Sequence, residues 1–406
     1  MSSPPSTGVA RRRVFYIPGY DPIPPRKYRE IYRREGAEQA GISGYELSIF
    51  PKPAGDGPYG WTVAARMDGM DVAATIDVLV WSDIVKASMS GSIPATYLQL
   101  ARTAWAYIGT GAFWRLMRLR KGPMIAALYP VVMLLAYLLV ACLAGWAAAA
   151  MIGWLGGGPW IAVPAWVLAF TLVLRLARSL DGRTFVFYLM HDFAYSAESH
   201  GAIPAALSDR MAAFGDLVAE ALASDVDEVL VVGHSSGAHL AVTVLADLIR
   251  AGRVPANGPA LGFLSLGQVV PMVSFLPNAM RLRGDLRYLC QRRDLTWVDV
   301  TAPGDGCAFA LCDPVAVSGV APEGKRWPLI ISAAFTQTLS PERRAALRWR
   351  FHRLHFQYLH AFDRPGDYDY FRITAGPQTL ADRYAGRPPS KSRIEAAVSK
   401  YTSVAG

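Results

Sequence analysis

Apolar and polar positions along the chain alternate in short segments that are typical of a sheet flanked by helices. Short apolar runs predict strands at 14–17, 45–50, 61–66, 74–81, 184–188, 229–232, 260–266, 295–300 and, more weakly, 328–331. Amphipathic stretches at 28–39 and 205–223 predict helices between them. Because strands and helices alternate, the pattern predicts the α/β class, with a mostly parallel sheet and flanking helices.

A long uncharged stretch interrupts this pattern. No charged residue occurs between Gly122 and Leu174, and a Gly-Gly-Gly-Pro turn at 156–159 divides the stretch into two runs. A helix needs about 20 apolar residues to cross a bilayer. The first run is longer than this and the second just reaches it, so we expect a transmembrane helical hairpin. A buried helical pair in a lid or a dimer interface is the alternative.

The uncharged stretch divides the chain into three predicted parts. Residues 1–86 and 183–390 form one discontinuous α/β domain, 87–182 an inserted interfacial helix and transmembrane hairpin, and 391–406 a C-terminal tail. Within the insertion, residues 97–114 mix aromatic side chains with Arg. This segment is expected either to lie in the membrane interface or to pack on the domain as an ordinary amphipathic helix.

Composition and charge favour a membrane partner over a nucleic acid. The 406 residues are 52% hydrophobic, and a net charge of +9, mostly from Arg, is spread along the chain without a basic block interleaved with aromatics. Basic residues precede and follow the hairpin: Arg115, Arg118, Arg120, Lys121, Arg175, Arg178 and Arg183. Because basic flanks stay on the cytoplasmic side, we expect a two-helix membrane protein with a cytoplasmic α/β domain next to an anionic bilayer face.

Two further features bear on the compartment. The four cysteines, Cys142, Cys290, Cys307 and Cys312, form no C-x-x-C pattern, which favours free thiols in a reducing compartment. Apolar sequence begins only at Val14 and its run is short, so we expect no cleaved secretion signal.

The segment Gly233-His234-Ser235-Ser236-Gly237 carries the strongest chemical signal. It lies between the apolar run 229–232 and a helix-forming run at 238–245. In the order strand, G-x-S-x-G, helix, glycines permit a sharp turn that exposes the serine at the positive end of a helix. We therefore predict Ser235 to be a nucleophile, whereas an ordinary turn is the alternative. His234 is expected to point away from the nucleophile and pack.

This segment and its surroundings resemble the α/β-hydrolase superfamily, and within it the lipase- and esterase-like serine hydrolases, over roughly 14–21 and 226–360. The resemblance implies a triad in the order nucleophile, acid, histidine. The implied acid is Asp305, which follows the strand at 295–300, with Asp299 and Asp313 as alternatives.

The resemblance also implies a histidine that opens a late helix and is followed three residues later by an aromatic. His355 fits this pattern and His360 is the alternative. His352 and His355 are also considered as metal ligands, but no nearby set of Cys, Asp or Glu completes a site, so no metal is expected. His239 is expected to be structural, and His191-Asp192, after the predicted strand at 184–188, is a weak candidate to line the substrate entrance.

Two backbone amides are implied as donors to an oxyanion. One belongs to Ser236, and the other to Tyr20 or Gly19 in a Pro18-Gly19-Tyr20 segment, where Pro replaces the usual His. The expected function is a membrane-anchored serine hydrolase that cleaves acyl esters, with lipids as the expected substrates. An acyltransferase with the same triad and a non-catalytic membrane adaptor are the alternatives. No cofactor is expected, because the chain has neither a G-x-x-x-x-G-K segment nor a dinucleotide-binding loop.

Overall fold

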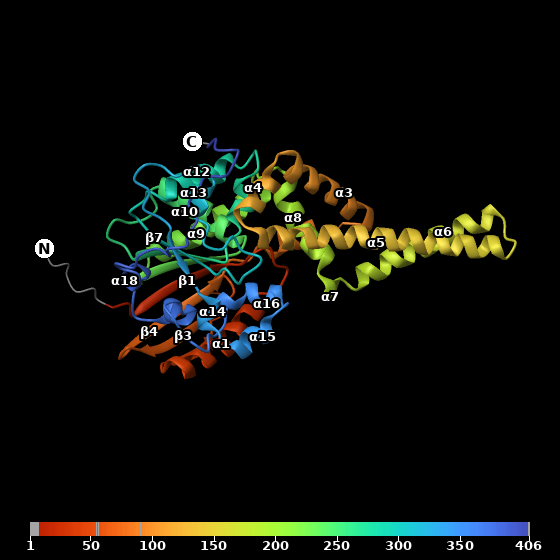
Figure 1. Cartoon of the computed structure of the whole chain (residues 1–406). Coiled ribbons are helices and arrows are strands. Elements are labelled where there is room, and N and C mark those ends of the chain that lie inside the picture. Colours follow the sequence, from red (N-terminus) through yellow and green to blue (C-terminus); the bar gives the residue numbers. More distant parts are fainter. Residues whose placement is uncertain (1–7, 54, 56, 90, 405–406) are drawn as a thin grey trace.

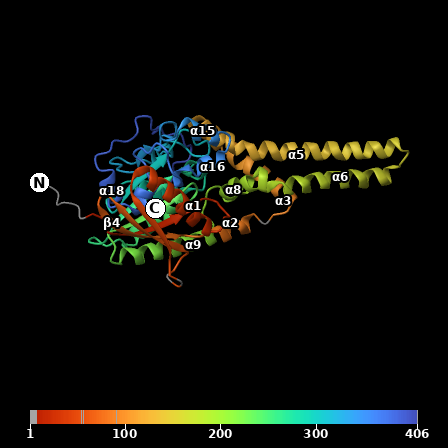
Figure 2. The ribbon, with the colours of Figure 1, turned by 90° about the horizontal axis from the view of Figure 1, so that it is seen from below.

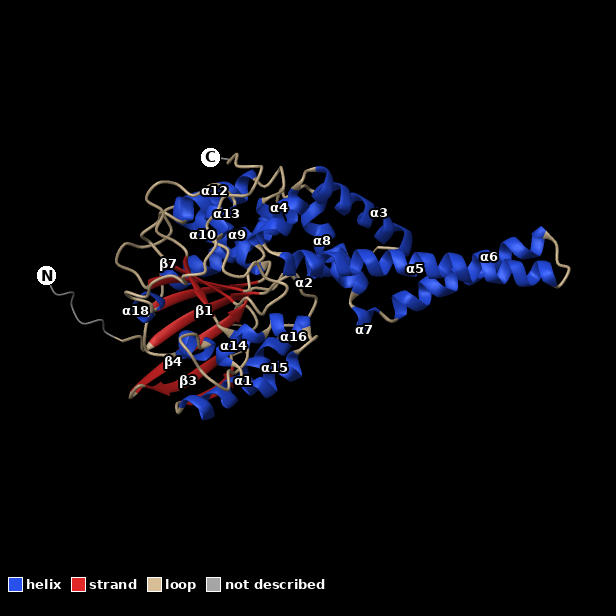
Figure 3. Ribbon diagram, in the orientation of Figure 1, coloured by secondary structure: helices blue, strands red, loops and turns tan. Residues whose placement is uncertain are grey.

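Eight strands form a mixed sheet at the centre of the body (Figures 1 and 3). The structure, a computed structural model, describes residues 8–404 except 54, 56 and 90, so the first residues considered for a secretion signal lie outside it. The strands are β1 (Arg11–Ile17), β2 (Glu46–Pro51), β3 (Gly60–Met67), β4 (Met70–Val78), β5 (Glu228–His234), β6 (Ala260–Leu266), β7 (Thr296–Thr301) and β8 (Leu329–Ser332). Their order is β2-β3-β4-β1-β5-β6-β7-β8.

The sheet combines parallel and antiparallel pairs. The β2–β3 and β3–β4 pairs are antiparallel, whereas the pairs from β4 through β1 to β8 are parallel. Asp68 and Gly69 both have positive φ between β3 and β4, which is the geometry of a tight two-residue hairpin turn. The predicted α/β class is therefore confirmed, and the sheet itself is mixed.

Helices cover both faces of the sheet (Figure 3). One face packs on α9 (Ala205–Leu222), α10 (Gly237–Arg250) and α12 (Met280–Leu289), and the other packs on α1 (Arg26–Ser43) and α17 (Tyr370–Ala375). Shorter body helices are α2 (Ser82–Ser88), α11 (Val270–Ser274), α13 (Pro314–Val317), α14 (Phe335–Thr338), α15 (Pro341–Leu347), α16 (Phe351–His355), η2 (Gln357–Leu359) and α18 (Leu380–Arg383). Successive β5 residues alternate between the two cores, as a strand buried on both faces requires.

The part of the chain that follows β4 and precedes α9 includes a helical hairpin, which projects from the body (Figures 1 and 2). Its arms are α5 (Lys121–Trp154) and α6 (Pro159–Ser179), both long and apolar enough to cross a membrane and both largely exposed. The arms pack closely at Gly145, where an added Cβ would lie 2.9 Å from the Trp166 ring. Length and composition define both helices as candidate membrane spans.

The beginning of α5 belongs to the body. Leu134 is fully buried and packs in a cluster with α3 (Ile93–Ala104) and α8 (Val186–Glu198). Tyr97 Oη donates to the Leu134 carbonyl at 2.9 Å. The remaining helices of this region are the π-helical η1 (Trp105–Gly109), α4 (Ala112–Leu119) and α7 (Asp181–Thr184). Helix α3 thus packs as an amphipathic helix, although Leu98 stays exposed.

The strand predicted at 184–188 is wrong, because this segment ends α7 and begins α8. The Asp181 carboxylate accepts hydrogen bonds from the amides of Phe187 and Tyr188, at 2.8 and 3.1 Å, and so satisfies free donors at the start of α8. His191 and Asp192 accordingly lie inside a helix. The apolar run is buried by helix packing rather than by strand pairing.

Candidate active site

The ends of four neighbouring strands bring the predicted site residues together. In the sheet register, Ile17 at the end of β1 pairs with Gly233, and His234 at the end of β5 pairs with Leu266. The loop after β7 carries Asp305. Because these strands are parallel, their following loops all emerge at one edge, which is where open α/β sheets form their sites.

Ser235 occupies a strained turn between β5 and α10. Its φ of 56° lies in the left-handed region, which a residue with a side chain seldom adopts. The turn is held by the Ser235 amide, which donates to the Leu266 carbonyl at 2.9 Å. Gly237 allows the close approach that follows, because an added Cβ there would lie 2.1 Å from the Ile17 carbonyl oxygen. Ser235 is therefore placed as the sequence pattern predicts, at the apex of a strand–turn–helix.

The segment 18–21 lies directly against Ser235. A Cβ added to Gly19 would lie 2.9 Å from the Ser235 Cβ. Trp81 Nε1 donates to the Pro18 carbonyl at 2.9 Å, and Tyr188 Oη donates to the Tyr20 carbonyl at 2.5 Å, so the segment is fixed from two sides.

Two backbone amides near the turn are free to bind a ligand. Within the described residues, the amides of Ser236 and Tyr20 donate to no protein acceptor, although both residues are buried. Buried amides without a partner are rare in proteins. Ser236 immediately precedes α10, so its amide also lies at the positive end of that helix.

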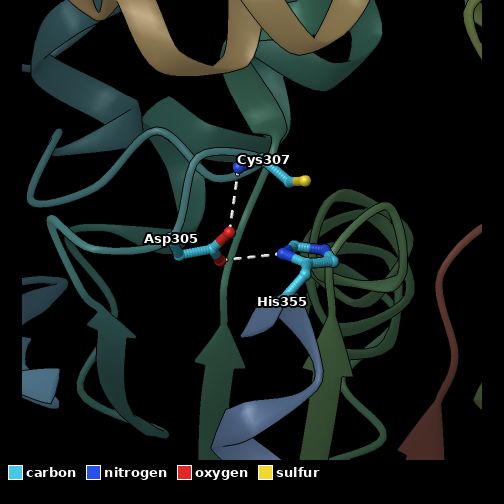
Figure 4. A group of neighbouring side chains, drawn as sticks. All are labelled: Asp305, Cys307 and His355. Atoms are coloured by element: carbon cyan, nitrogen blue, oxygen red, sulfur yellow. Dashed lines mark hydrogen bonds and ion pairs between the residues drawn. The ribbon is translucent and has the colours of Figure 1, made fainter. Parts of the chain in front are cut away.

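Asp305 and His355 form a direct pair (Figure 4). His355 Nδ1 lies 2.8 Å from Asp305 Oδ2, and both side chains are buried. Asp305 also accepts hydrogen bonds from the Cys307 amide at 2.9 Å and from Tyr358 Oη at 3.0 Å. His355 ends α16, whereas the sequence predicted it to open a helix, and Tyr358 is the aromatic three residues later.

The imidazole lies beside the Ser235 turn. A Cβ added to Gly267, which follows the Leu266 that holds Ser235, would lie 3.2 Å from His355 Cε1. Among the described residues, neither Ser235 Oγ nor His355 Nε2 has a hydrogen-bond partner. Hydrogen bonds between catalytic groups are often long before substrate binds.

Electrostatics favour a charged acid and a basic imidazole. Burial raises the pKa of Asp305, but the His355 charge and the three hydrogen bonds outweigh it, and the pKa lies below its usual value. Burial lowers the pKa of His355, but Asp305 outweighs this effect and the pKa lies above 6.5. Asp305 is thus placed to hold the Nδ1 proton and stabilise the protonated imidazole.

The alternative acids lie elsewhere. Asp299 is fully buried inside β7 and accepts a hydrogen bond from Ser265 Oγ at 2.5 Å, and burial raises its pKa to about 8. Asp313 caps α13 by accepting from the Val315 amide at 2.9 Å and pairs with Lys325. Neither carboxylate contacts a histidine.

The other histidines have structural surroundings. His234 is buried, its ring centroid lies 4.9 Å from that of His355, and its Nε2 lies 3.1 Å from the His355 carbonyl oxygen. His360 Nδ1 lies 2.6 Å from the Phe356 carbonyl oxygen. The His352 ring stacks on Phe185, and His239 lies on α10.

Asp305, Cys307 and His355 offer three atoms within 4.8 Å of one another, which a metal ion could use (Figure 4). Burial, reinforced by Asp305 and Asp192, raises the pKa of the Cys307 thiol, so the thiolate that binds metals is disfavoured. Both Asp305 oxygens already accept hydrogen bonds. The donor set therefore fits an acid–histidine pair better than a metal centre.

Three neighbours of the site were not identified from the sequence as such. Cys307 and Tyr358 bind Asp305, and Tyr188 binds the Tyr20 loop. The aromatic position three residues after His355 was the available signal for Tyr358. Tyr188 lies on α8, where the sequence predicted a strand.

No family model, curated protein or solved structure matches the chain.

Proposed function

We propose that this chain is a serine hydrolase of the α/β-hydrolase type that cleaves acyl esters. The observation that carries the proposal is the Asp305–His355 pair beside a strained serine turn on the same sheet edge. Strained backbone, a perturbed histidine pKa and unpaired buried amides seldom coincide in a purely structural turn. Each corresponds to a separate requirement of acyl transfer.

In the proposed mechanism, Ser235 Oγ attacks the ester carbonyl while its proton passes to His355 Nε2. Asp305 holds Nδ1–H and stabilises the imidazolium. The amides of Ser236 and Tyr20 bind the oxyanion, and His355 then gives its proton to the departing alcohol. Water, activated by the same imidazole, attacks the acyl-enzyme, releases the acid and restores Ser235.

We further propose that α5 and α6 anchor this hydrolase in a bilayer, with the body on the cytoplasmic side. The support is their length, their exposed apolar surface and the basic residues at the base of the hairpin. A hydrolase held at a bilayer meets acyl chains at high concentration, so lipid esters are the proposed substrates.

Labelling of the serine tests the catalytic proposal. We expect a fluorophosphonate probe to label the full-length chain in membrane fractions, and Ser235→Ala to abolish labelling. Ser236→Ala is the matched control, because it keeps the backbone amide of residue 236 and removes only the side-chain hydroxyl. A folded native chain that takes no label would favour the non-catalytic adaptor. Analysis of products with and without an added alcohol acceptor separates hydrolysis from acyl transfer.

A further inference from the structure

Helix α8 presents one polar face to the loop that carries the proposed oxyanion amide. Tyr188, Asp192 and Tyr195 share this face, because residues four and seven apart lie on one side of a helix. Tyr188 Oη donates to the Tyr20 carbonyl, and the Tyr195 ring centroid lies 5.7 Å from that of Tyr20. Asp192 lies between these two contacts and so belongs to the same junction.

The Asp192 carboxylate has no partner that explains it. It is half-buried, and within the described residues it makes neither a hydrogen bond nor an ion pair. Its electrostatic neighbours come from several elements: Asp21, Tyr20, Tyr107, Tyr188, Cys307 and His355. Burial raises its pKa to about 7, and the His355 charge opposes this rise only in part.

Asp192 is an electrostatic neighbour of the imidazole that is proposed to protonate the departing alcohol. It raises the pKa of His355, although by less than Asp305 does. Asp305 already occupies Nδ1, so Nε2 serves Ser235 and the leaving group. A carboxylate near this imidazole but outside the Asp305 pair is therefore suited to contact the alcohol part of an ester.

We propose that Asp192 accepts a hydrogen bond from a hydroxyl or ammonium group on the alcohol part of the substrate. The preferred substrates would then be esters of polyols or amino alcohols rather than of simple alkanols. This inference rests on the proposed hydrolase function and narrows its substrate class. A site built to bind a donor discriminates strongly against an analogue that lacks it, because its acceptor is left unpaired.

Soluble esters that share the butyrate acyl group and differ in their alcohol test this assignment in the full-length protein. The alcohols are propanol, glycerol and protonated 2-(dimethylamino)ethanol, and 4-nitrophenyl butyrate is a reference without a donor. We expect Asp192→Ala to lower kcat/KM about 10-fold for the donor-bearing esters relative to the propyl ester. Hydrolysis of the nitrophenyl ester, which has no donor for the carboxylate, should fall less than that of the donor-bearing esters. Glu198→Gln, an exposed carboxylate on the same helix, is the matched control.

Asp192→Asn distinguishes the two donors. Its amide oxygen still accepts a hydrogen bond, so activity on the glyceryl ester should be partly rescued, whereas the ammonium ester also loses the opposite charge and should be rescued less. Unchanged selectivity in Asp192→Ala, or an equal loss on all four esters, would overturn the assignment while leaving the hydrolase intact. A folded native chain that hydrolyses none of the esters would overturn the hydrolase proposal as well.

Discussion

Gly19, Ser235 and Gly237 form a set of backbone positions that depend on one another. Ser235 adopts a left-handed φ, which costs about 1–2 kcal/mol for a residue with a side chain. The two glycines let β1 and the start of α10 approach closely enough to hold that turn. The strain is therefore maintained by packing around the serine, as the proposed role of Ser235 as a nucleophile requires.

We expect Asp305→Asn to lower kcat of an ester substrate by about 10⁴-fold, because Asn holds the imidazole in the wrong tautomer. His355 must be neutral to accept the Ser235 proton, and its pKa lies above 6.5, so activity is lost as pH falls through that raised value. Loss of the Asp305 charge lowers the pKa and moves this acid limb to lower pH. A kcat/KM profile against pH measures both effects.

Asp299→Asn is the control for this experiment. Burial keeps Asp299 protonated near neutral pH, and Asn closely matches a neutral carboxyl group in shape. We expect its kcat to stay within about 3-fold of the native chain. An equal loss in both variants would contradict the assignment of Asp305 as the acid.

At the scale of single residues, the sequence predicted the residues of the candidate site better than the residues that surround them. The G-x-S-x-G motif and the order of the triad indicated Ser235, Asp305 and His355 by local pattern, and the structure brings Asp305 and His355 into contact. Whether they act as a triad stays a prediction. The sequence indicated Asp192 only as a weak candidate to line the substrate entrance and did not indicate Tyr188, because the positions of both side chains depend on where α8 packs.

Among secondary-structure elements, the strands of the body agree with the prediction, whereas the segment 184–188 does not. Short apolar runs with aromatic and β-branched residues are compatible with a buried strand or with part of a buried helix. Here the Asp181 carboxylate binds two amides at the start of α8, and neighbouring helices cover the run. Packing against helices distant in the sequence determined the secondary structure of this segment. The local pattern of residues does not contain that information.

The hairpin offers an element-scale prediction. Replacement of residues 138–173 by Gly-Ser-Gly-Ser removes the projecting part of both arms and keeps Leu134 in its cluster. Four residues can span the 8–10 Å between packed helices. We expect the shortened chain to be recovered without detergent and to keep fluorophosphonate labelling, as measured by sedimentation and gel fluorescence. Continued sedimentation with washed membranes would contradict the anchor.

For the whole molecule, the basic residues around the hairpin base determine the expected orientation. Arg175 lies near the end of α6, whereas Lys121 begins α5 beside the Asp305 loop of the body. A two-helix anchor with basic flanks at both ends keeps those ends on the cytoplasmic side. The turn at 155–158 is then expected to reach the opposite side.

Cysteine accessibility checks this orientation. In a chain with Cys142 and Cys307 replaced by Ala, we expect Gly158→Cys to react with a membrane-impermeant maleimide in intact cells. Gly158 has open space for a side chain. Phe50→Cys, at an exposed position on β2 of the body, should react only after the membrane is permeabilised. The reverse pattern would place the body outside the cytoplasm.

The unequal lengths of the two arms determine how far a lipid must travel. Gly145 packs against Trp166, and in antiparallel register from this contact the end of α6 at Ser179 faces roughly Val132. The α5 residues that precede Val132 extend about 17 Å beyond the end of α6, at 1.5 Å per residue. Near the start of this segment, Gly122 lies against Gly306 of the Asp305 loop. If the open end of the hairpin marks the membrane surface, the start of α5 lies inside the body above that surface, and Ser235 lies away from the lipid layer. Its substrates would have to be extracted from the lipid layer or arrive through water, which favours esters with short or single acyl chains.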